Sequence, residues 1–158
     1  MLFVSTVTVS LCCCMADTRH LDFIPIGYNG WGYRDTLTYT IESLHGMEQS
    51  RISLLLHTEG YSYKNFAIEV AISQDTALLY FARHDYLLGR SQSKNGIGHR
   101  CDYTLPVTNV TLCDTLPTTI TVTQQLDQPI LKGIREVGIH IGVPLSQPDK
   151  PVWRVDWH

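Results

Sequence analysis

The chain of 158 residues is poor in charge and lacks the patterns of several large protein classes. Charged residues make up 17% of it and hydrophobic residues 44%, which is a globular rather than a disordered composition. No basic tract occurs and the formal net charge is −3, so we expect no nucleic-acid partner. No apolar run reaches the roughly 18 residues of a membrane-spanning helix. The length fits one domain with a sizeable core.

The short motifs of common enzymes and metal sites are also missing. The sequence has no Gly-x-Ser-x-Gly elbow, no Gly-x-Gly-x-x-Gly fingerprint and no Walker loop. Its seven histidines form no His-x-His or His-x-x-x-His pair, and no Cys-x-x-Cys pair exists, so we expect neither a metal nor a cofactor. His84 and Asp85 are neighbours, but adjacent residues of a strand point to opposite faces. The sequence therefore predicts a protein that is not an enzyme.

Three consecutive cysteines, Cys12 to Cys14, follow a short apolar run at residues 1–11. This run matches the apolar core of a secretory signal, although no positive residue precedes it. The pattern resembles a bacterial lipoprotein signal, in which a small residue precedes the new N-terminal Cys and a Leu stands three positions before it. Cys14, with Cys13 and Leu11 at those positions, would then carry the diacylglycerol and palmitate chains, a stable anchor. Alternatively, the segment is an ordinary apolar strand with buried thiols.

Two cysteines, Cys101 and Cys113, remain when residues 1–13 are removed as a signal peptide. In an oxidising compartment they could form a disulfide, and they could also be two small buried hydrophobic residues. Their spacing of twelve residues allows a meeting across adjacent strands without requiring one. The sequence leaves both alternatives open.

Alternation of apolar and polar residues dominates the chain after residue 33. No segment has a convincing helical period, which excludes parallel α/β units with crossover helices. Seven or eight short strands separated by turns predict a single-domain, all-β antiparallel sandwich that is jelly-roll-like. The expected strands lie at 36–41, 51–57, 66–72, 77–83 (a buried strand), 103–110, 118–125 and 137–143, with a long loop at 87–100.

These patterns divide the chain into four parts. Residues 1–13 are the predicted signal peptide and 14–33 an irregular lead segment rich in turn residues. Residues 34–143 form the predicted sandwich, and 144–158 a Pro-rich tail. We therefore expect one folded domain that follows the anchored cysteine.

Aromatic residues gather in two predicted turns, YNGWGY at 28–33 and YSYKN at 61–65. Aromatic side chains at the loop tips of a β-sandwich can stack on sugars or contact partner proteins. The candidates for such a partner or glycan surface are Trp31, Tyr33, Tyr61 and Tyr63. Alternatively, these side chains cap the ends of the core.

Several segments occur in an order that is found in a known family. Gly30-Trp31 and Arg34-Asp35 precede the first expected strand, YSYKNF at 61–66 opens another, and LKGIREVGI at 131–139 stands near the end. Over roughly residues 20–143 the chain resembles the GldH family of gliding-motility lipoproteins of Bacteroidetes, and the last segment is the most specific. Within that segment, Gly133 suits a tight turn or a positive φ.

The resemblance implies a non-catalytic lipoprotein of the cell envelope, held by its lipid in what we expect to be the outer membrane. It implies protein partners in the envelope, among them the gliding and type IX secretion machinery, and membrane contact through the lipid anchor. A carbohydrate-binding module of the envelope is the alternative, because such modules use the same sandwich with exposed aromatic residues. A hydrolase would need a histidine and a carboxylate that converge in a pocket.

Overall fold

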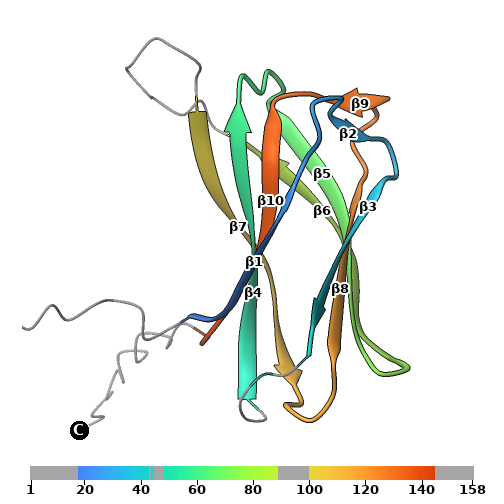
Figure 1. The fold of residues 1–158 in the computed structure, drawn as a ribbon, viewed down its shortest axis with the longest axis vertical. Helices are drawn as coiled ribbons and strands as arrows, with labels where there is room; N and C mark the ends of the chain where they lie inside the picture. Colours follow the sequence, from blue (N-terminus) through green and yellow to red (C-terminus); the bar gives the residue numbers. More distant parts are fainter. Residues whose placement is uncertain (1–17, 43, 45–47, 89–99, 145–158) are drawn as a thin grey trace, which may run out of the picture.

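The computed structural model describes residues 18–42, 44, 48–88 and 100–144. Within these ranges the chain forms ten β-strands and no helix (Figure 1). The described part accordingly contains no helix that could span a membrane. Cys14, the predicted signal peptide, most of the loop expected at 87–100 and nearly all of the tail lie outside the described residues, so these remain predictions.

Two four-stranded antiparallel sheets stack face to face (Figure 1). Their orders are β1-β10-β4-β7 and β3-β8-β5-β6, and a short pair, β2-β9, lies at one end. The strands of the first sheet are β1 (Thr18–Pro25), β10 (Ile134–Gly142), β4 (Glu48–Glu59) and β7 (Arg100–Leu112). Those of the second are β3 (Thr36–Ile41), β8 (Thr118–Gln124), β5 (Asn65–Gln74) and β6 (Ala77–Leu87), and the short pair is β2 (Trp31–Gly32) with β9 (Ile130–Leu131).

The connections between the eight long strands define a jelly roll. Every connection crosses from one sheet to the other except the β5–β6 hairpin. This is the double-sheet arrangement with Greek-key connections that jelly rolls share. The predicted all-β antiparallel sandwich, jelly-roll-like, is therefore confirmed.

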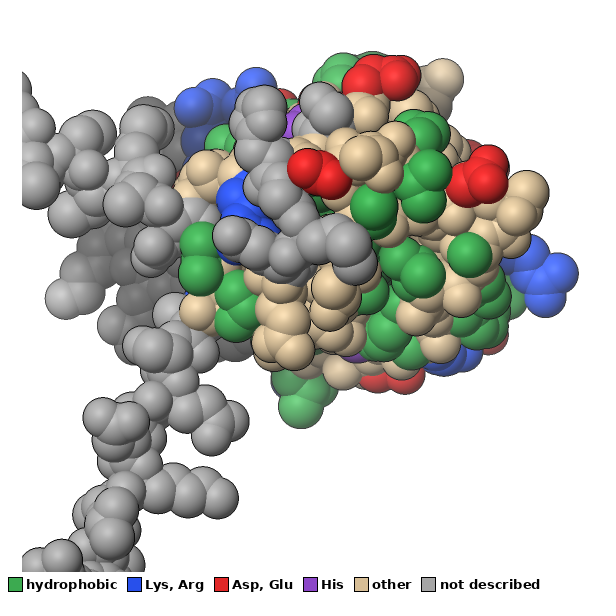
Figure 2. All heavy atoms as spheres, turned by 90° about the horizontal axis from the view of Figure 1, so that it is seen from below, with side chains coloured by type: hydrophobic (Ala, Val, Ile, Leu, Met, Phe, Trp, Pro, Cys, Tyr) green, Lys and Arg blue, Asp and Glu red, His purple; other side chains and the backbone are tan. Residues whose placement is uncertain are grey.

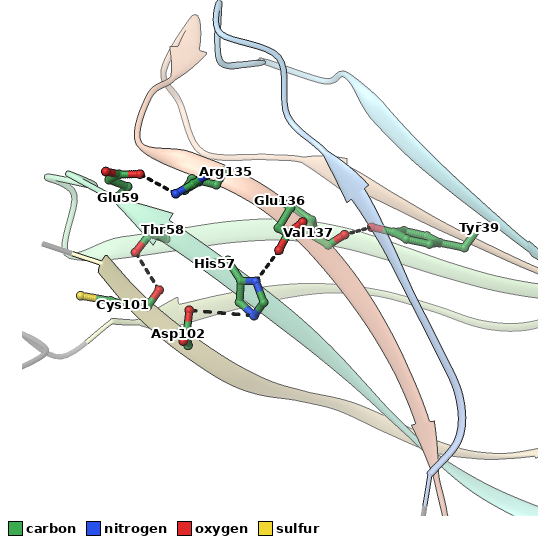
Figure 3. A network of polar contacts seen from close by, with 9 residues as sticks. All are labelled: Tyr39, His57, Thr58, Glu59, Cys101, Asp102, Arg135, Glu136 and Val137. Carbon is green, nitrogen blue, oxygen red and sulfur yellow. Dashed lines mark hydrogen bonds and ion pairs between the residues drawn. The ribbon is translucent and has the colours of Figure 1, made fainter. Parts of the chain in front are cut away.

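The core lies between the sheets, where the apolar faces of the alternating strands meet. Period-two alternation sends every second side chain inward, so the inward residues of the central strands are fully buried. They include Ile52, Leu54, Leu56, Phe66, Ile68, Val70, Ile72, Ile120, Val122, Val137, Ile139 and Ile141. The buried Tyr39 donates its hydroxyl to the carbonyl of Val137 at 2.7 Å, which ties the two sheets together (Figure 3). Burial raises the pKa of Tyr39 above its ordinary value.

The prediction of an irregular lead segment at 14–33 is wrong for residues 18–25, which form the edge strand β1. β1 pairs along its length with β10, so residues 18–25 belong to the sandwich. Its burial does not alternate, because Phe23 also packs on the outer face, directly over Gly138. A strand with side chains packed on both faces lacks the period-two signal by which strands are recognised.

The segment 77–83 is a strand as predicted, but the expectation that it is buried is wrong. It belongs to β6, an edge strand with Leu78 63% and Phe81 58% exposed. Its inner face carries Tyr80, His84 and Tyr86, each half-buried. Tyr86 donates its hydroxyl to the carbonyl of Pro106 at 2.7 Å on the facing strand β7, and burial raises the pKa of Tyr86 to about 12.

Cys101 lies at the start of β7, and Cys113 directly follows its last residue. Their separation of twelve residues in an extended strand corresponds to roughly 40 Å, whereas the Cα atoms of a disulfide lie about 4 to 7 Å apart. Both thiols are free and half-buried. A disulfide between them within one chain is therefore excluded.

Candidate functional site

The turn between β2 and β3 is held by Trp31 and Asp35. The Trp31 side chain is 2% exposed, and its indole Nε1 donates to the carbonyl of Asp35 at 3.0 Å. The carboxylate of Asp35 in turn accepts from the N–H of Gly32 at 3.1 Å. Trp31 is thus a core residue, and its prediction as part of an exposed surface is wrong. The alternative, that it caps the end of the core, describes it.

Tyr33 and Arg34 form the tip of this turn. The Asp35 N–H donates to the carbonyl of Gly32 at 3.0 Å, and Arg34 has φ of 64°, the left-handed conformation that favours glycine. Such a conformation costs a non-glycine residue about 1–2 kcal/mol. Tyr33 is 41% exposed, and the Arg34 guanidinium carbon lies 5.2 Å from its ring centroid. The turn therefore presents an aromatic ring and a guanidinium together at the surface.

Backbone hydrogen bonds fix this tip to the neighbouring strands. The N–H of Tyr33 donates to the carbonyl of Pro129 at 2.9 Å, and the N–H of Arg34 donates to that of Gln124 at 3.0 Å. Gln125 is held in the same way, through a 2.9 Å bond from its N–H to the carbonyl of Ala67. A rigid backbone lowers the entropy lost when such a surface binds a partner.

An open groove of about 520 Å³ lies beside Tyr33. The Arg83 guanidinium and the Asp85 carboxylate form a bidentate ion pair on its wall, with Nε–Oδ2 at 3.2 Å and Nη2–Oδ1 at 3.1 Å. Leu87, 84% exposed, stands at its edge. The full lining is Tyr33, Asn65, Arg83, Asp85, Tyr86, Leu87, Gln125, Leu126 and Asp127.

The second pair of predicted tyrosines lies at the same end of the sandwich. The rings of Tyr61 and Tyr63 meet edge to face at 5.4 Å, and both side chains are half-buried against the core. Tyr61 donates its hydroxyl to the carbonyl of Asn65 at 2.8 Å, and burial raises its pKa above the ordinary value. Tyr63 lines a second, smaller groove. This groove shares Asn65, Leu126 and Asp127 with the first, so Tyr33 and Tyr63 flank one continuous surface.

We call this surface the aromatic end, made of Tyr33, Tyr63, Leu87, Leu126 and Asp127. The link between β8 and β9 supplies Leu126 and Asp127, which the sequence analysis missed. Their only signal is one leucine among polar residues in QQLDQ, which does not distinguish a binding loop from any other loop.

On the outer face of the first sheet, a histidine lies between two carboxylates of the neighbouring strands (Figure 3). His57 Nδ1 lies 2.6 Å from Glu136 Oε1, and its Nε2 lies 3.9 Å from Asp102 Oδ1. The three residues sit side by side on β10, β4 and β7, and the Asp102 side chain is 80% exposed. The cluster lies on open strand surface rather than in a pocket, so it acts as a cross-strand tie.

His84 and Asp85 point apart as predicted. The His84 ring stacks on Tyr86 at 5.6 Å and its Nε2 lies 2.9 Å from the Tyr80 hydroxyl, whereas Asp85 pairs with Arg83 on the outer face. Burial lowers the pKa of His84. Among the described residues, no group of three or more His, Cys, Asp or Glu is placed to hold a metal ion.

The glycines of the segment 131–139 have structural roles. Gly133 has φ of 86°, and an added Cβ would lie 2.6 Å from the backbone nitrogen of Tyr61, so the predicted positive φ is confirmed. At Gly138 a Cβ would lie 2.5 Å from the Phe23 ring. Ile134 and Val137 between them are 5% and 0% exposed. This segment therefore closes the core through Ile134 and Val137, and its residues 132–135 also line an open groove.

Comparison with known proteins finds a matching family model and three matching chains of solved structures. The family model described as GldH lipoprotein matches residues 22–141. The crystal structure of dimeric latent PorU from Porphyromonas gingivalis is similar at a TM-score of 0.34 and 9% identity, over 83% of this chain and 13% of that one. This chain thus spans only a small part of the length of PorU. No curated protein matches.

The family match covers more than half of the chain and includes the Trp31 turn, the Tyr61–Tyr63 segment and the segment that closes the core. Seven of the eight long strands of the jelly roll lie wholly or largely within it, and β1 lies half within it. The chain therefore belongs to the GldH lipoprotein family, whose members are lipid-anchored proteins of the cell envelope associated with gliding motility.

Proposed function

We propose that this protein is a non-catalytic lipoprotein of the outer membrane that acts by binding a protein partner through its aromatic end. The observation that carries the proposal is the pairing of an exposed Tyr33 with the Arg34 guanidinium on a rigid turn. Tyrosine and arginine are, with tryptophan, the side chains that most often dominate binding energy at protein interfaces. Exposed Leu87 and half-buried Leu126 add apolar surface beside them.

The left-handed backbone conformation of Arg34 also supports the proposal. A glycine at this position would relieve the backbone strain, yet the chain has an arginine there. Strain of this kind gathers at binding and active sites, where a particular side chain is needed in a particular place. We infer that the guanidinium at this tip contacts the partner.

The position of the aromatic end relative to the anchor is compatible with a partner that lies away from the membrane that holds the lipid. β1 begins at Thr18, four residues after Cys14 in the sequence, and Thr18 pairs with Gly142 at the end of the sandwich away from β2 and β9 (Figure 1). The eight residues of β1 span about 25 Å. With lipid on Cys14, the aromatic end would face away from the membrane, toward proteins of the envelope such as the gliding and type IX secretion machinery.

Site-specific photo-crosslinking tests this proposal. A photoreactive amino acid at position 33 or 63 of the anchored full chain should yield a covalent adduct with an envelope protein in intact cells. The same amino acid at Thr40, which is exposed at the opposite end of β3, is the control and should yield none. Adducts from position 40 alone, or equal adducts from all three positions, would contradict the proposal.

A glycan is the second candidate ligand, favoured by the composition of the groove beside Tyr33. An exposed ring next to planar polar groups, here Asn65, Gln125 and Asp127, is suited to stacking on a sugar and bonding its hydroxyls. A glycan array with wild type, Tyr33→Ala and Tyr63→Ala separates the two candidates. Sugar binding that both variants lose would replace the protein partner with a glycan. Trp31→Ala is unsuitable here, because it would remove a core residue.

A further inference from the structure

β6 is the least protected edge of the two sheets. Natural edge strands are blunted by shortness, proline, bulges or lysine. Among the four edges of the described sheets, β3 has six residues, β1 ends on Pro25 and β7 carries Pro106 within the strand. β6 has eleven residues without proline or lysine, and it pairs only with β5. Its one irregularity, at Leu79, precedes the regular stretch from Phe81 to Leu87.

The outer face of β6 is apolar except for one ion pair. Leu79, Phe81 and Leu87 are 39%, 58% and 84% exposed. Between them, Arg83 and Asp85 pair with each other on the same face, with Nη2–Oδ1 at 3.1 Å. The β5–β6 hairpin also reaches the end of the molecule seen in Figure 2, where hydrophobic side chains (green) are spread over the described surface among a few charged ones. Exposed apolar surface along a free edge indicates a strand that pairs with another chain.

We propose that β6 pairs antiparallel with β6 of a second copy of this chain, about a twofold axis at His84. In this register Arg83 lies directly opposite Asp85 of the second copy, and Asp85 opposite its Arg83. Phe81 lies opposite Leu87 in the same way. Each charge therefore meets its opposite and each exposed apolar side chain meets another, which is the self-complementarity that a twofold contact requires.

The neighbouring strand extends the same charge pattern. Glu69 on β5 lies opposite Arg83 within one chain. A second copy would place its Asp85 on the other side of Arg83, so that the signs alternate along this row of the joined sheet. An axis at Ala82 would instead place Asp85 opposite Leu79 and Arg83 opposite Phe81, which leaves the charges without opposite partners. The charges thus select the register.

The contact joins the β3-β8-β5-β6 sheets of the two copies into one sheet of eight strands. It spans seven residues of each copy, Phe81 to Leu87, which is about 23 Å of strand. A single strand pair is a small contact, so we expect a dimer that forms readily only when the copies are concentrated, as two anchored proteins in one membrane are.

Charge exchange between two variants tests the proposal. Sedimentation of the full chain carrying Cys14→Ala, which keeps the protein free of lipid, should reveal a concentration-dependent dimer. Arg83→Asp alone and Asp85→Arg alone should each weaken it about tenfold, because like charges then face each other across the axis twice. An equimolar mixture of the two variants should dimerise like the wild type, because each acid again faces a base.

Two controls separate this contact from the intrachain ion pair and from net charge. Restoration in the mixture cannot arise from the pair within one chain, which both variants lack. Asp102→Arg, a similar charge change on the exposed edge strand β7, should leave the dimer unchanged. A wild type that stays monomeric up to about 1 mM, or a mixture that does not recover, would overturn the proposal.

Discussion

The indole nitrogen of Trp31 and the backbone oxygen of Asp35 lie 3.0 Å apart, and this bond sets the shape of the turn that carries Tyr33 and Arg34. The ring itself is buried beside Phe66, with centroids 6.1 Å apart. Trp31 therefore acts on the surface from inside the core, through the turn it holds.

Two different replacements of Trp31 should destabilise the protein, one slightly and the other strongly. Trp31→Phe keeps an aromatic ring in the core and loses mainly the bond to Asp35, which should lower the free energy of unfolding by about 1 kcal/mol. Trp31→Ala also leaves a cavity and should cost about 3–5 kcal/mol. Chemical denaturation measures both. Tyr28→Ala is the control, because Tyr28 is fully exposed, and a loss in Trp31→Ala no larger than in this control would contradict the account.

Gly133 should tolerate alanine less well than Gly60 does. Both have positive φ, 86° and 71°, so alanine is strained at either position by about 1 kcal/mol. Only at Gly133 would the new Cβ also meet the backbone of Tyr61, at 2.6 Å. We expect Gly133→Ala to lower the free energy of unfolding by more than about 2 kcal/mol and Gly60→Ala by about half of that. If a denaturant titration gave equal losses of unfolding free energy for the two variants, the close approach to the Tyr61 backbone would not contribute to the cost.

The protein should lose stability as the pH falls below about 6.5. Burial lowers the pKa of both His84 and His140 from the ordinary 6.5, and Arg51 lowers that of His140 further. At these two positions the unfolded chain binds protons more readily than the folded one. The contribution of these two histidines to the free energy of unfolding is therefore fully present above pH 6.5. It is lost as the pH falls through the pKa values that they have in the folded protein.

Thermal unfolding at pH 7.5 and 5.5 measures this effect. The drop in Tm between the two pH values should be smaller in the double variant His84→Gln/His140→Gln than in the wild type. An unchanged drop would assign the pH dependence to other groups.

The lipid should depend on one cysteine. Metabolic labelling with a fatty-acid probe should mark the wild type and leave Cys14→Ala unlabelled, whereas Cys12→Ala should be labelled as strongly as the wild type. Equal labelling of the wild type and Cys14→Ala would exclude Cys14 as the anchor.

Much of the fold could be predicted from local pattern alone. β5, β8 and β10 bury one face against the opposite sheet, and this imposes the strict alternation by which they were recognised. β1 escaped recognition because Phe23 packs over Gly138 on the outer face, so its pattern follows a partner more than a hundred residues away.

The edge position of β6 and the aromatic end were harder to predict. A continuous apolar run such as ALLYFAR looks the same in a buried strand and in an edge strand with an apolar outer face, because the run does not encode how many neighbours the strand has. Trp31 and Tyr33 stand two residues apart, and the sequence does not show that Trp31 packs beside Phe66 while Tyr33 stays 41% exposed. Leu126 joins Tyr33 and Tyr63 through tertiary packing, which no local pattern records.

Quantitative co-purification from native membranes tests whether the aromatic end binds a partner protein. The double variant Tyr33→Ala/Tyr63→Ala is compared with Thr38→Ala/Thr40→Ala, a matched pair on the exposed face of β3. We expect that an envelope protein recovered with the wild type and with the threonine variant is lost about tenfold or more with the tyrosine variant, while both variants remain folded at the temperature of the experiment. Equal recovery of that protein with all three chains would contradict a role of the aromatic end in partner binding.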